Sequence, residues 1–159
     1  MIFVTVGTHD QGFERLVRKI DDLVEEKKIR DNVIIQTGYT EYKPKACKWF
    51  KFVSPQEFEK ICKKSSLIIT HAGVGSIMTC LKFSKSIIVV PRLKKFNEHR
   101  DDHQLQITKE LEKQGRILAV YDIAEIKNVI SKARNWKPKR SFKENKILFL
   151  IDNYLKSLK

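Results

Sequence analysis

The stretch Leu67-Ile68-Ile69-Thr70-His71-Ala72-Gly73-Val74-Gly75-Ser76 joins a short apolar run to a glycine-rich turn. The run predicts a buried strand, and Ser76 is expected to open a helix that continues over 77–83. Glycines let the backbone approach a ligand closely, and free N–H groups at a helix start suit a phosphate. With donors from His71 and Ser76, the turn is expected to bind a nucleotide or a nucleotide-sugar diphosphate. The alternative is a tight turn that needs glycine for its geometry alone.

Short apolar runs alternate with helical patterns along most of the chain. The expected strands lie near 2–6, 32–36, 49–53, 66–70, 86–90 and 116–120. The expected helices lie near 11–27, 55–63, 75–83, 101–114, 122–133 and 142–158. Ser54-Pro55-Gln56-Glu57 has the residues of a capped helix start. This alternation predicts an α/β fold, a Rossmann-like parallel sheet with helices on both faces.

The size and composition of the chain fit one globular domain. Its 159 residues include 42% hydrophobic residues, and no stretch approaches the roughly 20 apolar residues of a membrane span. The start at 1–6 reads as a strand without the basic leader of a signal peptide, so we expect a cytoplasmic protein. Cys47, Cys62 and Cys80 have no metal-ligand spacing, and the last two are expected in the core.

The net charge of +13 favours an anionic partner. Nucleic acid, an acidic membrane face and a phosphate-rich substrate all meet that description, and a lysine-rich surface without a ligand is equally compatible. A basic nucleic-acid-binding α/β module is therefore one alternative. No stretch carries the aromatic and basic motif of an RNA-binding sheet, so nucleic acid is the less favoured partner.

Two further polar segments follow predicted strands. Gly7-Thr8-His9-Asp10-Gln11-Gly12 is neither G-x-G-x-x-G nor a Walker motif, and a helix cap by Thr8 or Asp10 is its alternative interpretation. Pro91-Arg92 and then 97–104 follow the strand near 86–90. His99 and His103 lie four residues apart there, but no further cluster has ligand spacing, so we expect no metal. Ligands of an open parallel sheet bind beyond such strand ends.

The order of these motifs resembles a known family. The turn at 71–76, Val89-Val90-Pro91-Arg92 and Asp102-His103-Gln104-Leu105 are similar to the C-terminal, donor-binding half of GT-B glycosyltransferases of family 28. The start at 2–9 resembles stand-alone halves, namely the catalytic subunit of the two-part dolichol-pathway N-acetylglucosaminyltransferase and exopolysaccharide subunits of the PssE or EpsF type. The resemblance spans about 2 to 120 and implies one half of a GT-B fold.

The resemblance also implies roles for particular residues. Thr79 stands where many GT-B enzymes carry a ribose-binding Glu, so the ribose-binding residue stays open. His9 and His99 are the candidate catalytic bases for the acceptor hydroxyl. The implied donor-binding residues are Gly7, Thr8, His71, Gly73, Gly75, Ser76, Arg92, Asp102, His103 and Gln104.

The implied activity is that of a UDP-sugar-dependent glycosyltransferase subunit acting by inversion. It would transfer the sugar to a lipid-linked acceptor without a cofactor or metal, because a helix dipole and donors can neutralise the diphosphate. The donor sugar stays open among N-acetylglucosamine, galactose and glucuronate, and a non-catalytic nucleotide-sugar sensor is a further alternative.

A half of this kind implies a second subunit. The resemblance points to a membrane-anchored partner of the PssD or dolichol-pathway type, which would hold this chain as a heterodimer at the cytoplasmic membrane face. We divide the chain into a UDP-sugar-binding domain, 1–136, and a basic hinge with a C-terminal helix, 137–159, as a possible docking element.

Overall fold

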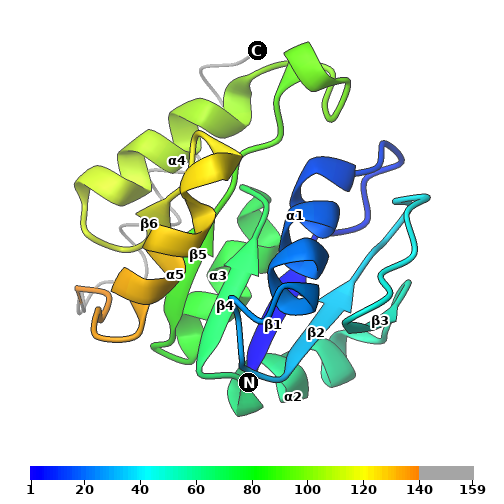
Figure 1. Ribbon diagram of the computed structural model, residues 1–159. Helices are drawn as coiled ribbons and strands as arrows, with labels where there is room; N and C mark the ends of the chain where they lie inside the picture. The colour runs from blue at the N-terminus through cyan, green and yellow to red at the C-terminus, as the bar shows by residue number, and fades with distance from the viewer. Residues whose placement is uncertain (140–159) are drawn as a thin grey trace.

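The computed structural model of the chain describes residues 1–139, and these form one parallel sheet covered by helices (Figure 1). The sheet has the strand order β3-β2-β1-β4-β5-β6, and every neighbouring pair is parallel. The strands are β1 (Ile2–Thr5), β2 (Val33–Gln36), β3 (Lys48–Phe50), β4 (Leu67–Thr70), β5 (Ser86–Val89) and β6 (Leu118–Ala119). The helices are α1 (Glu14–Glu25), α2 (Pro55–Lys64), α3 (Val74–Lys82), α4 (His103–Lys113) and α5 (Ile126–Ala133). Short 3₁₀ turns, η1 (Lys94–Phe96) and η2 (Ile123–Glu125), precede α4 and α5.

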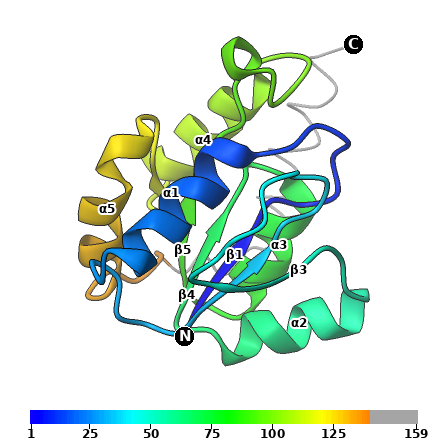
Figure 2. The same ribbon diagram turned by 45° about the vertical axis from the view of Figure 1, so that its right-hand side comes forward.

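Helices cover both faces of the sheet, as the sequence predicts. Figure 2 shows α1 and α5 on one side of the strands and α2 and α3 on the other. Successive side chains of a strand point to opposite faces, so β1 sends Ile2 and Val4 into the core under α1 and α5 and Phe3 into the core under α2, α3 and α4. Two buried cores on a parallel sheet confirm the Rossmann-like fold.

Most predicted elements are present, with shifted ends. The Ser54 hydroxyl accepts a hydrogen bond from Glu57 N at 3.2 Å, which confirms the start of α2. Helix α3 begins earlier than predicted, at Val74 with Gly73 as its cap, so Ser76 lies within its first turn and does not open it. Neither Thr8 nor Asp10 caps α1, since the cap position is held by Phe13. The Phe13 N–H donates to the hydroxyl of Thr40 instead.

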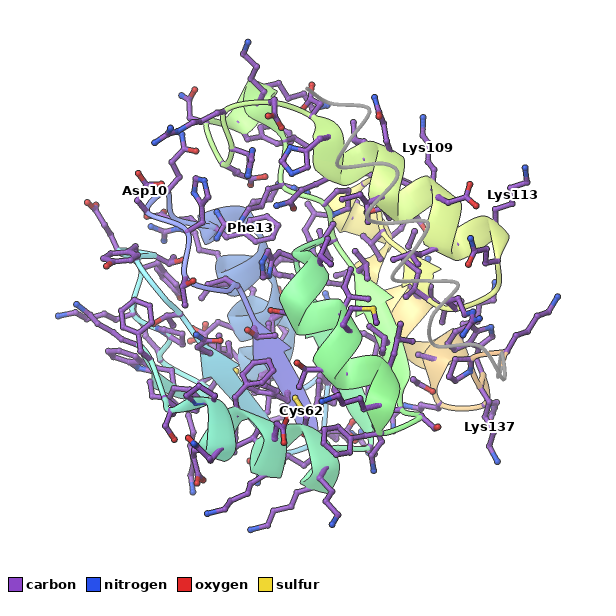
Figure 3. The ribbon with its side chains drawn as sticks, turned by 180° about the vertical axis from the view of Figure 1, so that it is seen from behind. Asp10, Phe13, Cys62, Lys109, Lys113 and Lys137 are labelled. Carbon is purple, nitrogen blue, oxygen red and sulfur yellow. The ribbon has the colours of Figure 1, made fainter. Side chains whose placement is uncertain are left out.

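The core holds the two cysteines that were expected there. Cys62 on α2 and Cys80 on α3 are fully buried, with their Sγ atoms 3.9 Å apart. By contrast, lysines carry the positive charge on the outside, and Figure 3 shows Lys109 and Lys113 on α4 pointing away from the sheet. Within 1–139 no helix has both the length and the apolar composition to cross a bilayer. The predicted helix near 142–158 lies outside the described residues.

The strand order reverses at the centre of the sheet. From β1 the chain runs outward through β2 and β3, then returns to place β4 on the other side of β1 and continues to β5 and β6. Thr5 and Thr70 end these two central strands in register. The loops after β1 and β4 therefore diverge from neighbouring strand ends, which is where open α/β sheets bind ligands.

Candidate functional site

The His71 ring fills the space between the loops that follow β1 and β4. A Cβ atom added to Gly7 or to Gly73 would overlap that ring, and Gly7 also has a φ of +76°. Both glycines are thus required to seat an imidazole and to turn the backbone, before any ligand is considered. The sequence predicted these glycines as ligand contacts, and the structure adds a packing reason for them.

Burial keeps His71 uncharged. Only 8% of the residue is exposed, and burial, followed by the nearby Arg92 cation, lowers its pKa to about 3. A neutral imidazole has one N–H donor and one lone pair, so it can give a single hydrogen bond to an anion. His71 lines two adjoining pockets and forms part of the wall between them.

The first pocket, here called the glycine pocket, has a volume of about 460 Å³. It is lined by Gly7, Thr8, Gln36, Val53, Pro55, Phe58, His71, Gly73, Gly75, Ser76 and Thr79. The start of α3 lies at this pocket, and its cap, Gly73, has no side chain to accept from the first turn. The N–H groups of a first helical turn have no partner within the helix, so they are free to bind an anion.

Gln36, Val53, Pro55 and Phe58 line the glycine pocket and were missed from the sequence. Gln36 ends β2 beside Thr5, whose hydroxyl donates to the Gln36 Oε1 atom at 2.5 Å. Phe58 packs edge-on against the ring of Phe3 in the core, with the two ring centroids 5.5 Å apart. Gln36 could have been predicted as a site residue from the pairing of β1 with β2, because the carboxyl ends of neighbouring parallel strands lie at the same edge of the sheet.

Thr79 also lines the glycine pocket, one turn into α3 from Gly75. Its hydroxyl donates to the Gly75 carbonyl at 2.9 Å, which leaves its oxygen lone pairs for a ligand. The short side chain offers one acceptor atom where a glutamate would offer two.

The second pocket, here called the histidine pocket, has a volume of about 310 Å³ and contains all four histidines of the chain. It is lined by Thr8, His9, His71, Ala72, Gly73, Val74, His99, His103, Gln104 and Ile107. The rings follow one another closely, since the centroid of His99 lies 4.6 Å from that of His9 and 4.7 Å from that of His103. The chain brings them from three separate loops.

His9 and His99 both favour the neutral form. Burial and then Arg92 lower the pKa of His9, while burial and then His103 lower the pKa of His99. The opposing effect of Asp10, whose carboxylate lies 3.0 Å from His9 Nδ1, is smaller. A neutral imidazole has one lone pair that can accept a proton from a hydroxyl group. Here His9 Nδ1 accepts from Gln11 N at 3.2 Å and His99 Nδ1 from Asp101 N at 3.4 Å, contacts that a substrate hydroxyl would have to replace.

Arg92 was predicted to bind the donor, but it lies outside both pockets. It is 1% exposed, lines neither pocket, and its guanidinium donates to four backbone carbonyls, those of Val6, Gln11, Gly12 and Glu98, at 2.8 to 3.0 Å. Burial lowers its pKa to about 10, so it remains charged at neutral pH. Arg92 thus fastens the loop after β1 to the loop before α4 and does not reach toward a ligand.

The segment 102–104 is only partly directed at the pocket. Asp102 lines neither pocket, and its Oδ1 accepts from Lys94 N at 2.9 Å. Gln104 lines the histidine pocket, but its Oε1 accepts from the N–H groups of Ala72 and Arg92, which ties the loops after β4 and β5 together. His103 lines the same pocket. Of these three residues, which were predicted to bind the donor, His103 and Gln104 line a pocket and Asp102 does not.

Comparisons with known proteins bear on the family and the fold of this chain. Residues 1–150 match the model of the glycosyltransferase family 28 C-terminal domain. The mouse protein named UDP-N-acetylglucosamine transferase subunit ALG13 is 29% identical over 124 residues, covering 72% of this chain and 10% of its own length. The subunit of that name from Candida albicans is 32% identical over 89 residues, covering 56% of this chain and 29% of its own. The chain therefore spans a minor part of these relatives.

Solved structures share the fold. An NMR structure of ALG13 superposes with a TM-score of 0.56 at 21% identity, covering 86% of this chain and 87% of that one. Acinetobacter baumannii MurG superposes with a TM-score of 0.58 at 18% identity, covering 97% of this chain and 49% of MurG. This chain therefore superposes on about half of MurG, which confirms the predicted half of a GT-B fold.

Proposed function

This chain belongs to glycosyltransferase family 28, and on that premise we propose that it binds a UDP-sugar and transfers the sugar to a lipid-linked acceptor. The observation that carries the proposal is the glycine pocket, which joins the start of α3 to the loop after β1 at the point where the strand order reverses. The names of the mouse and Candida relatives support UDP-N-acetylglucosamine as the first donor to test.

The diphosphate of the donor would lie against the first turn of α3. The positive end of the helix dipole and the N–H groups of Gly75 and Ser76 favour an anion there. The hydroxyl of Ser76 and the single N–H of neutral His71 add two donors from opposite sides of the pocket. None of these groups carries a full positive charge, so binding would rest on oriented dipoles.

The nucleoside would occupy the remainder of the glycine pocket. Val53, Pro55 and Phe58 give that end an apolar wall suited to a flat base. Thr79 lies on α3 between this wall and the phosphates, where it would meet the ribose with one oxygen. Gln36 offers a side-chain amide to the same ligand.

The sugar would extend past His71 into the histidine pocket, where the reaction takes place. The oxygen of an acceptor hydroxyl attacks the anomeric carbon from the face opposite UDP, and the bond from that carbon to the diphosphate oxygen breaks with its electron pair. The neutral imidazole of His9 or of His99 takes the hydroxyl proton. The start of α3 stabilises the negative charge that develops on departing UDP.

A partner subunit would complete the site. Relatives are named as subunits, and this chain covers about half of MurG. We place the chain at the cytoplasmic face of a membrane through a membrane-anchored partner that presents the acceptor. The net charge of +13 suits work beside anionic lipids and a lipid-linked phosphate group.

Ligand binding to the isolated chain tests the first half of this proposal. Calorimetry with UDP, UDP-N-acetylglucosamine, UDP-galactose and UDP-glucuronate, beside a mixed oligonucleotide, separates a nucleotide-sugar site from a nucleic-acid surface. We expect Ser76→Ala to weaken UDP binding about tenfold, because a hydrogen bond to a charged group is lost. Ser131→Ala on α5, where the hydroxyl only meets the Lys127 carbonyl, is the control. Equal UDP affinities in Ser76→Ala and wild type, or oligonucleotide binding alone, would contradict the proposal.

A further inference from the structure

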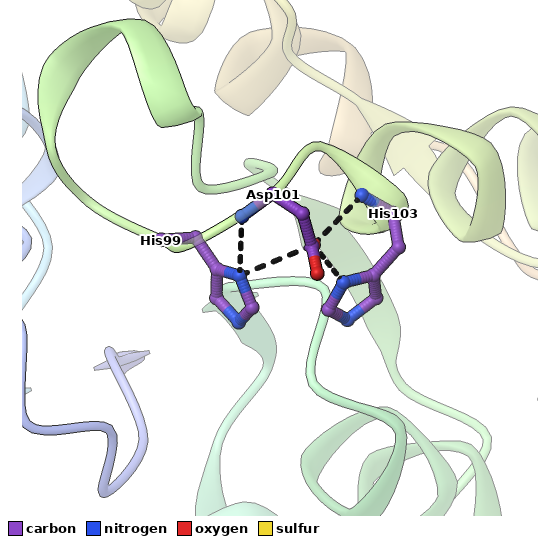
Figure 4. Close-up of side chains that lie close together, drawn as sticks. All are labelled: His99, Asp101 and His103. Atoms are coloured by element: carbon purple, nitrogen blue, oxygen red, sulfur yellow. Dashed lines mark hydrogen bonds and ion pairs between the residues drawn. The ribbon is translucent and has the colours of Figure 1, made fainter. Parts of the chain in front are cut away.

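A carboxylate and two imidazoles converge at the mouth of the histidine pocket. His99, Asp101 and His103 each offer one ligand atom, and these atoms all lie within 4.8 Å of one another (Figure 4). Asp101 stands between the two rings, with its Oδ1 atom 3.3 Å from His99 Nδ1 and in contact with His103 Nδ1. The side chains of His99 and His103 are 12% and 26% exposed and that of Asp101 is 61% exposed, so the two rings are recessed and the carboxylate is open to solvent.

We propose that His99, Asp101 and His103 bind a divalent transition-metal ion of the Zn²⁺ class. Two imidazoles and one carboxylate form a donor set that suits such an ion and leaves a coordination position open. Imidazole nitrogen distinguishes this site from one for Mg²⁺ or Ca²⁺, which prefer oxygen ligands. The proposal departs from the sequence prediction of no metal, and with the ion bound His99 is a ligand, which leaves His9 as the base of the proposed reaction.

The backbone fixes the three ligands in one short segment. Asn97 in the left-handed conformation turns the chain after η1, and Asp102 holds the segment through its bond to Lys94 N. Asp101 Oδ1 also accepts from His103 N at 3.2 Å, at the start of α4. The alternate positions 99, 101 and 103 thereby face one point. The sequence did not single out Asp101 as a ligand, because the third ligand was expected in a separate cluster.

The surroundings of the cluster include a further imidazole and two arginines. The His9 ring lies next to His99, with the two ring centroids 4.6 Å apart. Two arginines are close, but the Arg92 guanidinium is held by backbone carbonyls behind the pocket, and Arg100 is directed to Asp10 at 3.8 Å. Arg92 keeps its positive charge, so it opposes a cation nearby, and the donor set has to outweigh that repulsion.

Metal titration of the full chain, prepared without a histidine tag and stripped with a chelator, tests the proposal. We expect calorimetry to find one Zn²⁺ bound per chain and Co²⁺ to give the visible absorption of a low-coordinate site. The near-ultraviolet band of a cobalt–thiolate bond should be missing, because Cys47, Cys62 and Cys80 are buried. Zinc binding that is absent in the folded wild type, or a thiolate band, overturns the assignment.

Three variants locate the ion. His103→Ala and Asp101→Asn should each lower Zn²⁺ affinity at least tenfold, while Asp22→Asn on the exposed side of α1 should leave it unchanged. Circular dichroism and the midpoint of thermal unfolding show whether each variant is folded, and UDP binding is measured separately at the glycine pocket. Zinc affinities that are equal in wild type and in both cluster variants place the ion elsewhere and overturn the proposal.

Discussion

The two pockets share Thr8, His71 and Gly73 but are built from different chemistry. The glycine pocket is lined by backbone, small side chains and an apolar wall, and His71 is the one titratable residue among those lining it. The histidine pocket gathers four imidazoles, from the loops after β1, β4 and β5 and from the start of α4. Fixed dipoles hold an anion without a change in protonation, whereas imidazoles move protons or bind a cation. The two halves of the site can therefore be disturbed separately.

The largest effect is expected from Arg92→Met, which should loosen the loops of the histidine pocket. Four backbone carbonyls lose their donor in a buried place, and we expect the free energy of unfolding to fall by about 4 kcal/mol. Urea denaturation measures this loss. Arg18→Met is the matched control, because Arg18 is exposed on α1 and pairs only with Glu14 and the Tyr42 ring, so we expect a change within about 0.5 kcal/mol. Similar losses in both variants would mean that Arg92 does not fasten the loops.

The next prediction compares stability after substitution of a glycine that makes room for the His71 ring and of a glycine that lines the glycine pocket without contacting that ring. Gly7→Ala should destabilise the chain by about 3 kcal/mol, since a methyl group there meets the His71 ring and the backbone is left-handed. Gly75→Ala adds a methyl group in open space within α3, so it should be neutral or stabilise by up to about 1 kcal/mol. Urea denaturation compares the two. If Gly75→Ala proves the more damaging, the packing account of Gly7 and His71 is wrong.

The burial of His71 predicts a pH dependence of stability. Its pKa is about 3 in the folded chain and near 6.5 when unfolded, so the unfolded state takes up a proton first as the pH falls. The stability from the neutral ring is complete above pH 6.5 and is lost toward pH 3, by at most about 1.4 kcal/mol for each pH unit. Chemical denaturation of wild type and His71→Asn at several pH values measures the difference. Parallel curves for the two proteins would show that His71 is not the source.

The fold and one pocket were predictable because their signals are local. Apolar runs alternating with helical patterns gave the parallel sheet, and the turn at 71–76 gave the start of α3 within a few residues. Gly7 and His71 were identified as site residues, although their mutual packing depends on the pairing of β1 with β4. Contacts between distant loops have no such local signal.

The role of Arg92 illustrates what the sequence leaves open. An arginine beside a predicted ligand site suggests a contact with phosphate, yet its partners are carbonyls at 6, 11, 12 and 98. Every residue has a backbone carbonyl, whatever its side chain. No pattern of side chains in the sequence therefore predicts which carbonyls Arg92 binds. The wall of the glycine pocket was missed for a similar reason, since Val53 and Phe58 reach it through the placement of β3 and α2.

The smallest predicted effect concerns the part of the glycine pocket that would hold the ribose. Thr79→Glu would place two acceptor oxygens where one hydroxyl now lines the pocket, and we expect UDP to bind about tenfold more tightly if the ribose lies there. Calorimetry with UDP and with its 2′,3′-dideoxy analogue measures the change. The gain should vanish for the analogue, because it lacks the hydroxyls that the carboxylate would bind. Thr79→Gln, of nearly the same size but uncharged, should give a smaller gain. Weaker UDP binding in Thr79→Glu would mean that the carboxylate meets the diphosphate, so the phosphates would extend along α3 as far as Thr79 and the ribose would have to lie elsewhere in the pocket.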